Sequence, residues 1–117
     1  MAATLQRYDT GKRLSEMTVC NGVAYLAGQV AGDASQGIDG QTRQVLAAID
    51  ALLARAGTDK TKLLRVEIFL ADLADFAAMN AVWDEWVPKG SAPPRATVQA
   101  QLAKPQWKVE MVATAAV

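Results

Sequence analysis

The sequence predicts an α+β domain with a single mixed six-stranded sheet and two helices packed on one of its faces. Three observations lead to this fold class. Short β-like runs alternate along the chain in the order β-β-β-α-β-α-β-β. Each of two stretches with a helical apolar period lies between two such runs. The connections are long enough for right-handed parallel crossovers, and 117 residues suit one domain, 1–117.

The N-terminal part is predicted to contain three strands. Residues 5–15 are polar, and we expect only an edge strand there, near residues 5–8. Residues 17–20 and 23–27 are short apolar runs joined by Asn21-Gly22. This dipeptide favours a type I′ hairpin turn, because both of its central residues need positive φ. The second and third strands should therefore form an antiparallel hairpin.

The first helix is expected after a loop rich in Gly, Ser and Asp at residues 31–38. Asp39 suits the N-cap, where a carboxylate accepts bonds from free backbone N–H groups. Gly57 follows at the place where a helix commonly exits in the left-handed conformation. The apolar stripe between them has helical spacing and predicts a buried face: Val45, Ile49, Leu52, Leu53 and Ala56.

The next strand and the second helix follow directly. Residues 64–70 alternate between apolar and polar side chains near their start, which is typical of a strand. Asp72 and Asp75 suit the N-terminus of the helix, and Pro88 and Gly90 end it. Its predicted apolar stripe is Phe76, Met79, Trp83, Trp86 and Val87.

Residues 93–117 form the last two predicted strands, on either side of Lys104-Pro105. Arg95 opens the first strand, and Glu110 lies inside the second between Val109 and Met111. A charge in an apolar strand is costly if it is buried without a partner. Arg95 is therefore either the partner of an acid at a sheet edge or an anion site that grips a carboxylate with two parallel bonds. Glu110 is either that acid or a group that positions water.

One face of the predicted sheet has no cover, and association with other copies would cover it. The apolar strand residues include side chains that must point there: Ala27, Ala96, Val98, Val109 and Met111. The formal net charge of zero gives little colloidal protection, which also favours an oligomer. Asn80, next to the second apolar stripe, is interpreted as a helix-to-strand tether or a site residue.

Composition excludes several kinds of chemistry. The chain has no His and one Cys, so Ser-His-Asp and Cys-His systems are absent and a zinc site is not expected. Cys20 is interpreted as a structural thiol. Twelve basic and twelve acidic residues offer no surplus charge for nucleic acid. No signal peptide or membrane span is apparent, so a cytoplasmic location is expected.

The ordered motifs of the chain resemble the RidA/YjgF family of enamine/imine deaminases, also known under the names endoribonuclease L-PSP and translation initiation inhibitor. The resemblance covers about residues 13–117 and is nearest to the YoaB-like subgroup. Its motifs, in order, are Asn21-Gly22, Tyr25-Leu26-Ala27-Gly28-Gln29, Gln41-Thr42, residues 66–72, Asp75-Phe76, Asn80, Pro94-Arg95 and, fifteen positions after Arg95, Glu110 preceded by Val109.

The resemblance implies a chorismate mutase-like fold and a homotrimer with a central barrel, outer helices and sites in the clefts between subunits. It implies that Arg95 binds the carboxylate of a 2-imino acid and that Glu110 lies beside the attacking water. Gly28 and Thr97 would line the pocket with backbone groups, and Asn80 would lie near it. The implied reaction converts a 2-imino acid to a 2-keto acid and ammonia, with no cofactor or metal.

The chain departs from the family pattern at the rim of the implied pocket. Ala27 stands where active deaminases commonly have Ser, Thr97 stands where they commonly have Cys, and residues 13–16 replace a segment that supplies a tyrosine. A non-catalytic trimer that binds small carboxylates such as 2-keto acids is therefore the alternative hypothesis. Ribonuclease or translation-inhibitor activity is the hypothesis least favoured, because histidine and positive charge are both lacking.

Overall fold

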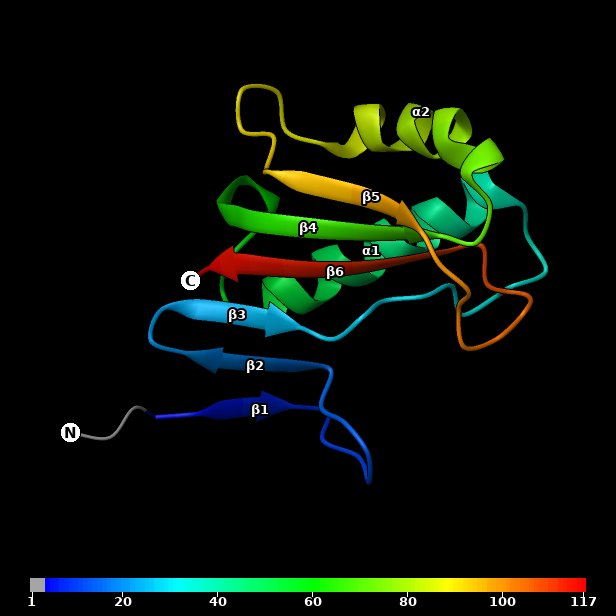
Figure 1. Cartoon of the computed structure of the whole chain (residues 1–117). Coiled ribbons are helices and arrows are strands. Elements are labelled where there is room, and N and C mark those ends of the chain that lie inside the picture. The colour runs from blue at the N-terminus through cyan, green and yellow to red at the C-terminus, as the bar shows by residue number, and fades with distance from the viewer. Residues whose placement is uncertain (1–3) are drawn as a thin grey trace.

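A computed structural model describes residues 4–117 of the chain (Figure 1). It contains the predicted order of strands and helices, with two short 3₁₀ turns added. The elements are β1 (Gln6–Tyr8), β2 (Met17–Cys20), β3 (Val23–Leu26), α1 (Ile38–Arg55), η1 (Lys60–Lys62), β4 (Leu63–Leu70), η2 (Leu73–Asp75), α2 (Phe76–Trp86), β5 (Arg95–Gln99) and β6 (Val109–Ala116).

The six strands form one sheet in the order β1-β2-β3-β6-β4-β5. The last strand of the chain, β6, is inserted between β3 and β4 and runs antiparallel to both. The crossover through α2 makes β4 and β5 parallel neighbours, so the predicted mixed sheet is confirmed. Asn21 and Gly22 have φ values of 52° and 77°, as the predicted turn between β2 and β3 requires.

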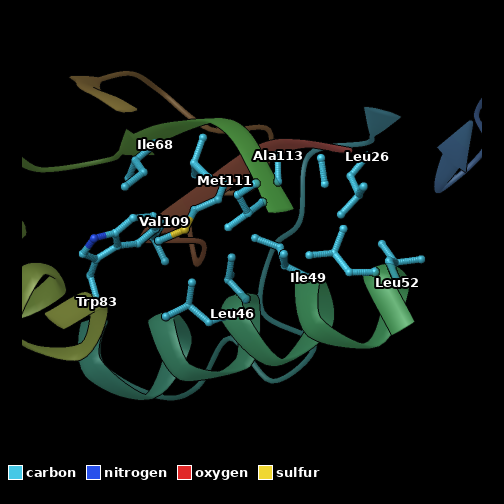
Figure 2. Packing of buried hydrophobic residues seen from close by; sticks show 14 of the residues in the cluster. Leu26, Leu46, Ile49, Leu52, Ile68, Trp83, Val109, Met111 and Ala113 are labelled. Atoms are coloured by element: carbon cyan, nitrogen blue, oxygen red, sulfur yellow. The ribbon is translucent and has the colours of Figure 1, made fainter. Parts of the chain in front are cut away.

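Both helices pack on one face of the sheet, and the core lies between these two layers (Figures 1 and 2). Figure 2 shows Leu46, Ile49 and Leu52 of α1 pointing toward Met111 and Ala113 of the sheet. Val109, Met111, Ala113 and Ala115 are all fully buried, so one face of β6 lies entirely under the helices. Alternate residues of a strand point to opposite faces, so the other face of β6 looks away from them.

The opposite face of the sheet has no covering layer within the described chain. Tyr25 of β3 is 52% exposed and Val98 of β5 is 47% exposed. Ala96 is exposed as well, as predicted for the uncovered face. Val109 and Met111, which the sequence analysis grouped with these residues, instead belong to the core, because the pleat of β6 turns them toward α1.

Three local predictions need correction. The N-cap of α1 is Gly37, and Asp39 lies inside the first turn, where its charge still suits the helix dipole. Phe76 is 41% exposed and does not belong to the buried stripe of α2, because it is the first residue of that helix. The third strand ends at Leu26, one residue before the predicted end. Gly57 has φ 79° directly after Ala56, the C-cap of α1, as expected.

No helix among residues 4–117 is both long and apolar enough to cross a membrane.

Candidate functional site between the sheet edge and the second helix

Arg95 is the first residue of the edge strand β5, directly after Pro93-Pro94. It lies in register with Val66 of β4, whose side chain is fully buried under the helices. Arg95 therefore points to the helix face of the sheet. There its Nη2 atom donates a hydrogen bond of 2.7 Å to Oδ1 of Asn80 on α2. Its guanidinium carbon lies 5.1 Å from the centre of the Trp83 ring.

The guanidinium of Arg95 lacks a carboxylate partner within the described chain. The salt bridges of residues 4–117 do not include it, and its hydrogen-bond acceptor is a neutral amide. Its Nη1 atom is buried and has no hydrogen-bond partner. An unpaired buried donor on a charged group is costly, whereas a bound carboxylate would satisfy it. This arrangement favours an anion site over a structural ion pair.

Asn80 and Thr97 lie on the same side of the sheet as Arg95. Asn80 is half-buried and connects α2 to β5 through Arg95, so it acts as the predicted tether. Thr97 lies two residues after Arg95 and in register with the buried Ile68 of β4. Its side chain therefore projects beside that of Arg95 along the same edge.

Glu110 lies on the other face of the sheet. Its neighbours Val109 and Met111 are fully buried under the helices, so the pleat turns Glu110 away from them. It is half-buried and stands opposite Phe69 of β4. Its carboxylate lies against Gly28, where an added Cβ would come 2.9 Å from Cδ of Glu110 and nearer still to Oε2. Glycine is therefore required at position 28 for this close approach.

The structure thus separates the predicted site residues into two clusters. The first cluster is Arg95, Asn80 and Thr97, and the second is Gly28 and Glu110. They lie on opposite faces of the sheet and at different levels along β6, because Arg95 is level with Ala113 through Val66 while Glu110 is level with Phe69. An Arg95–Glu110 salt bridge within one chain, left open by the sequence, is therefore excluded.

Two residues of these surroundings were not predicted as site residues. Trp83 was assigned only to the apolar stripe of α2, yet its ring also supports the guanidinium of Arg95. Gln41 is fully buried, and its side chain accepts a hydrogen bond from the backbone N–H of Lys108, two residues before Glu110. A glutamine in the first turn of an amphipathic helix carries no local signal for such a role, since its partners are 65 and 67 residues away.

The described residues contain no cluster of His, Cys, Asp or Glu side chains that could hold a metal ion. Cys20 is half-buried in β2 and its thiol makes no disulfide.

Comparison with known proteins decides the family. The model of the family described as Endoribonuclease L-PSP matches residues 4–117. The chain belongs to the RidA/YjgF (L-PSP) family. Among curated RidA/YjgF relatives, a RutC family protein of Haemophilus ducreyi is 50% identical over 113 residues, which cover 97% of each chain. The RutC family protein YoaB of Escherichia coli is 45% identical over 117 residues, covering 97% of this chain and 99% of YoaB.

Solved structures of the RidA/YjgF family share the fold. A crystal structure of an uncharacterized protein from Pseudomonas aeruginosa has a TM-score of 0.95 at 45% identity and covers 97% of this chain and 98% of its own. The YjgF family member NMB1025 from Neisseria meningitidis has a TM-score of 0.94 at 42% identity, covering 97% and 94% respectively. The predicted α+β fold and the predicted family are thereby confirmed.

Proposed function

We propose that this RidA/YjgF protein is an imine/enamine deaminase that hydrolyses 2-imino acids to 2-keto acids and ammonia. The active form is proposed to be a homotrimer with a site in each cleft between subunits. One subunit would supply Arg95, Asn80 and Thr97, and its neighbour would supply Gly28 and Glu110. This division follows from the separation of the two clusters within one chain, since a shared site then requires two copies.

The observation that carries the proposal is the half-buried guanidinium of Arg95 with its unpartnered Nη1 atom. Asn80 and Trp83 hold the guanidinium from the side of α2 without neutralising its charge. The planar guanidinium keeps one donor atom, Nη1, without a protein acceptor, and a carboxylate is the acceptor that a guanidinium binds most strongly. A small 2-imino or 2-keto acid is therefore the class of ligand that this edge of the sheet would take.

In the proposed reaction, Glu110 accepts a proton from a water molecule while the water oxygen attacks C2 of the imine. Glu110 then gives this proton to the imine nitrogen, which completes the carbinolamine. The carbinolamine hydroxyl next passes its proton to the amino nitrogen by way of Glu110, the C2–N bond breaks, the C2=O bond forms and ammonia leaves. Backbone groups near Gly28 and Thr97 are proposed to orient the imine nitrogen. Positioning and one general base, the latter contributing about 10²- to 10⁴-fold, suffice because such imines also hydrolyse in water.

A carboxylate-binding trimer without catalysis is the second candidate, and the rim residues favour it. Ala27 and Thr97 stand where deaminases commonly have Ser and Cys. Both candidates share the Arg95 carboxylate site and differ only in whether Glu110 acts on water. The ribonuclease activity in the name of the family model finds little support here, because the net charge is zero and histidine is absent.

The test compares the wild type with Arg95→Lys and Glu110→Gln in two assays. One assay follows hydrolysis of 2-imino acids generated in situ by an amino acid oxidase, and the other titrates a 2-keto acid. Arg95→Lys retains charge but loses the planar fork, so keto acid binding should weaken by about 1.5 to 3 kcal/mol. Glu110→Gln retains shape but loses the base, so binding should persist while hydrolysis slows.

Arg43→Lys and Glu85→Gln are the matched controls, because these residues form an exposed ion pair of 3.5 Å between the helices and belong to neither cluster. They should leave both assays unchanged. Binding without hydrolysis in the wild type would establish the non-catalytic candidate. If Arg95→Lys lowers the melting temperature and leaves keto acid affinity unchanged, Arg95 is only structural and both candidates are wrong.

A further inference from the structure

Gln41 is a buried polar side chain in the first turn of α1 whose amide group bonds only to backbone atoms. Its Nε2 atom donates to the carbonyl oxygens of Ala34, Gln36 and Gln106 at 3.2, 2.9 and 3.1 Å. Its Oε1 atom accepts from the Lys108 N–H at 3.0 Å. Both functional groups of the amide are therefore satisfied, as burial of a polar group requires.

These bonds connect two loops that are far apart in the sequence. Ala34 and Gln36 belong to the loop between β3 and α1, and Gln106 and Lys108 belong to the loop between β5 and β6. In the described chain, no other side chain forms a hydrogen bond with the backbone of residues 100–110. The amide of Gln41 therefore supplies all the side-chain hydrogen bonds to the backbone of the segment that leads into β6 in the described chain.

The two connected loops lead directly to the Gly28–Glu110 cluster. Lys108 precedes Glu110 by two residues, and its carbonyl accepts from the Ala71 N–H at 3.0 Å. Gln29, next to Gly28, exchanges two backbone bonds of 2.8 and 3.1 Å with Met111. Glu110 therefore lies between Met111, which is bonded to the backbone of Gln29, and Lys108. The backbone N–H of Lys108 donates to the side chain of Gln41.

We propose that Gln41 is a positioning residue that fixes the carboxylate of Glu110 over Gly28 through Lys108. This inference rests on the proposed deaminase function for its catalytic consequence, whereas the positioning itself can be measured without catalysis. Loss of the amide would leave three backbone carbonyl groups and one backbone N–H without their side-chain partner. The loop would then shift to find other partners, and Glu110 would move with it.

Gln44 provides a matched control on the same helix. Its amide also bonds loop backbone, accepting from the Asp33 N–H at 2.9 Å and donating to the Asp33 carbonyl at 3.0 Å. It supports only the loop before α1 and has no bond to residues 100–110. Replacing either glutamine by methionine retains an unbranched side chain of similar length. The Gln41 variant therefore loses the bonds to the loop that precedes Glu110, whereas the Gln44 variant keeps them.

The experiment measures Gln41→Met and Gln44→Met for imine hydrolysis, 2-keto acid affinity and amide hydrogen exchange. Gln41→Met should lower kcat by about ten- to a hundredfold, the usual cost of a small displacement of a catalytic group. Keto acid affinity should persist, because Arg95 belongs to the other cluster. Exchange should accelerate at the Lys108 amide and its neighbours while β4 remains protected. Gln44→Met should leave kcat and the exchange of Lys108 as in the wild type.

Gln41→Asn keeps an amide that is one methylene too short, and it replaces Gln41→Met if that variant does not fold. Equal kcat in Gln41→Met and wild type, or faster exchange spread evenly over the sheet, would overturn the proposal. If the wild type hydrolyses no imine, the deaminase proposal fails while the positioning is still decided by exchange. Unchanged hydrogen exchange at the Lys108 amide in both Gln41 variants would refute the proposed positioning role of Gln41.

Discussion

Gly28 offers a sharp test of the Gly28–Glu110 cluster, because an added methyl group there meets the side chain of Glu110 first. The three heavy atoms nearest to an added Cβ at position 28 all belong to Glu110. Gly28 is also not among the glycines with positive φ, so alanine can adopt its backbone conformation. The substitution Gly28→Ala should therefore displace the Glu110 carboxylate and leave the backbone in place.

The size of the displacement follows from the contact distances. The new Cβ would lie 2.9 Å from Cδ of Glu110, whereas carbon atoms rest at about 3.5 to 4.0 Å. The carboxylate must therefore move by roughly 1 Å. A misplacement of that size at a catalytic group can cost about 10²-fold in rate. Stability should change by only about 1 kcal/mol or less, because a flexible side chain can move and alanine restricts the unfolded chain.

The assay is imine hydrolysis in Gly28→Ala, with a thermal melt and a 2-keto acid titration on the same protein. Gly32→Ala is the matched control, since a Cβ at Gly32 would meet no atom within 4 Å. We expect Gly28→Ala to lose about 10²-fold in kcat with little change in melting temperature, and Gly32→Ala to resemble the wild type. Wild-type kcat in Gly28→Ala would refute the role of the Glu110 position in catalysis.

Three further predictions concern assembly, ligands and pH. Light scattering should give three times the 12.4 kDa of one chain, because the exposed face around Tyr25 and Val98 lacks a cover within the chain; a stable monomer at micromolar concentration would contradict the shared site. A 2-keto acid should raise the melting temperature, whereas RNA should not bind at physiological salt; tight, salt-sensitive RNA binding would reverse this ranking. The hydrogen bond from Arg55 lowers the pKa of Asp9 below its ordinary 3.8, so the stabilisation is present above pH 3.8 and is lost as the pH falls through the lower folded value. The melting-temperature difference between the wild type and Asp9→Asn should therefore disappear in acid, and a constant difference would argue against this ion pair.

Much of the fold could be predicted because its signals are local. The turn at Asn21-Gly22, the apolar stripe of α1 and the exit at Gly57 each depend on the conformational preferences of a few neighbouring residues. The prediction of Asp39 as N-cap was wrong by two positions, because several residues of the preceding loop can cap a helix and only the backbone path selects Gly37.

Candidate site residues could be predicted because charge in an apolar strand is conspicuous. Arg95 and Glu110 were selected for that reason, and the structure shows Arg95 without an acidic partner within the described chain. The supporting residues Trp83 and Gln41 could not be found in this way. Their roles depend on contacts with β5 and with the loop before β6, which no nearby sequence pattern records.

The sequence by itself determined the elements, their order and the two charged residues that depart from the apolar pattern. It also excluded catalysis by histidine and an intrachain disulfide, because the chain contains no histidine and a single cysteine. Only the tertiary structure decided that Arg95 and Glu110 lie on opposite faces of the sheet and at different levels along β6. The physical reason is that the position of β6 between β3 and β4, and its register with Phe69 and Val66, arise from long-range strand pairing.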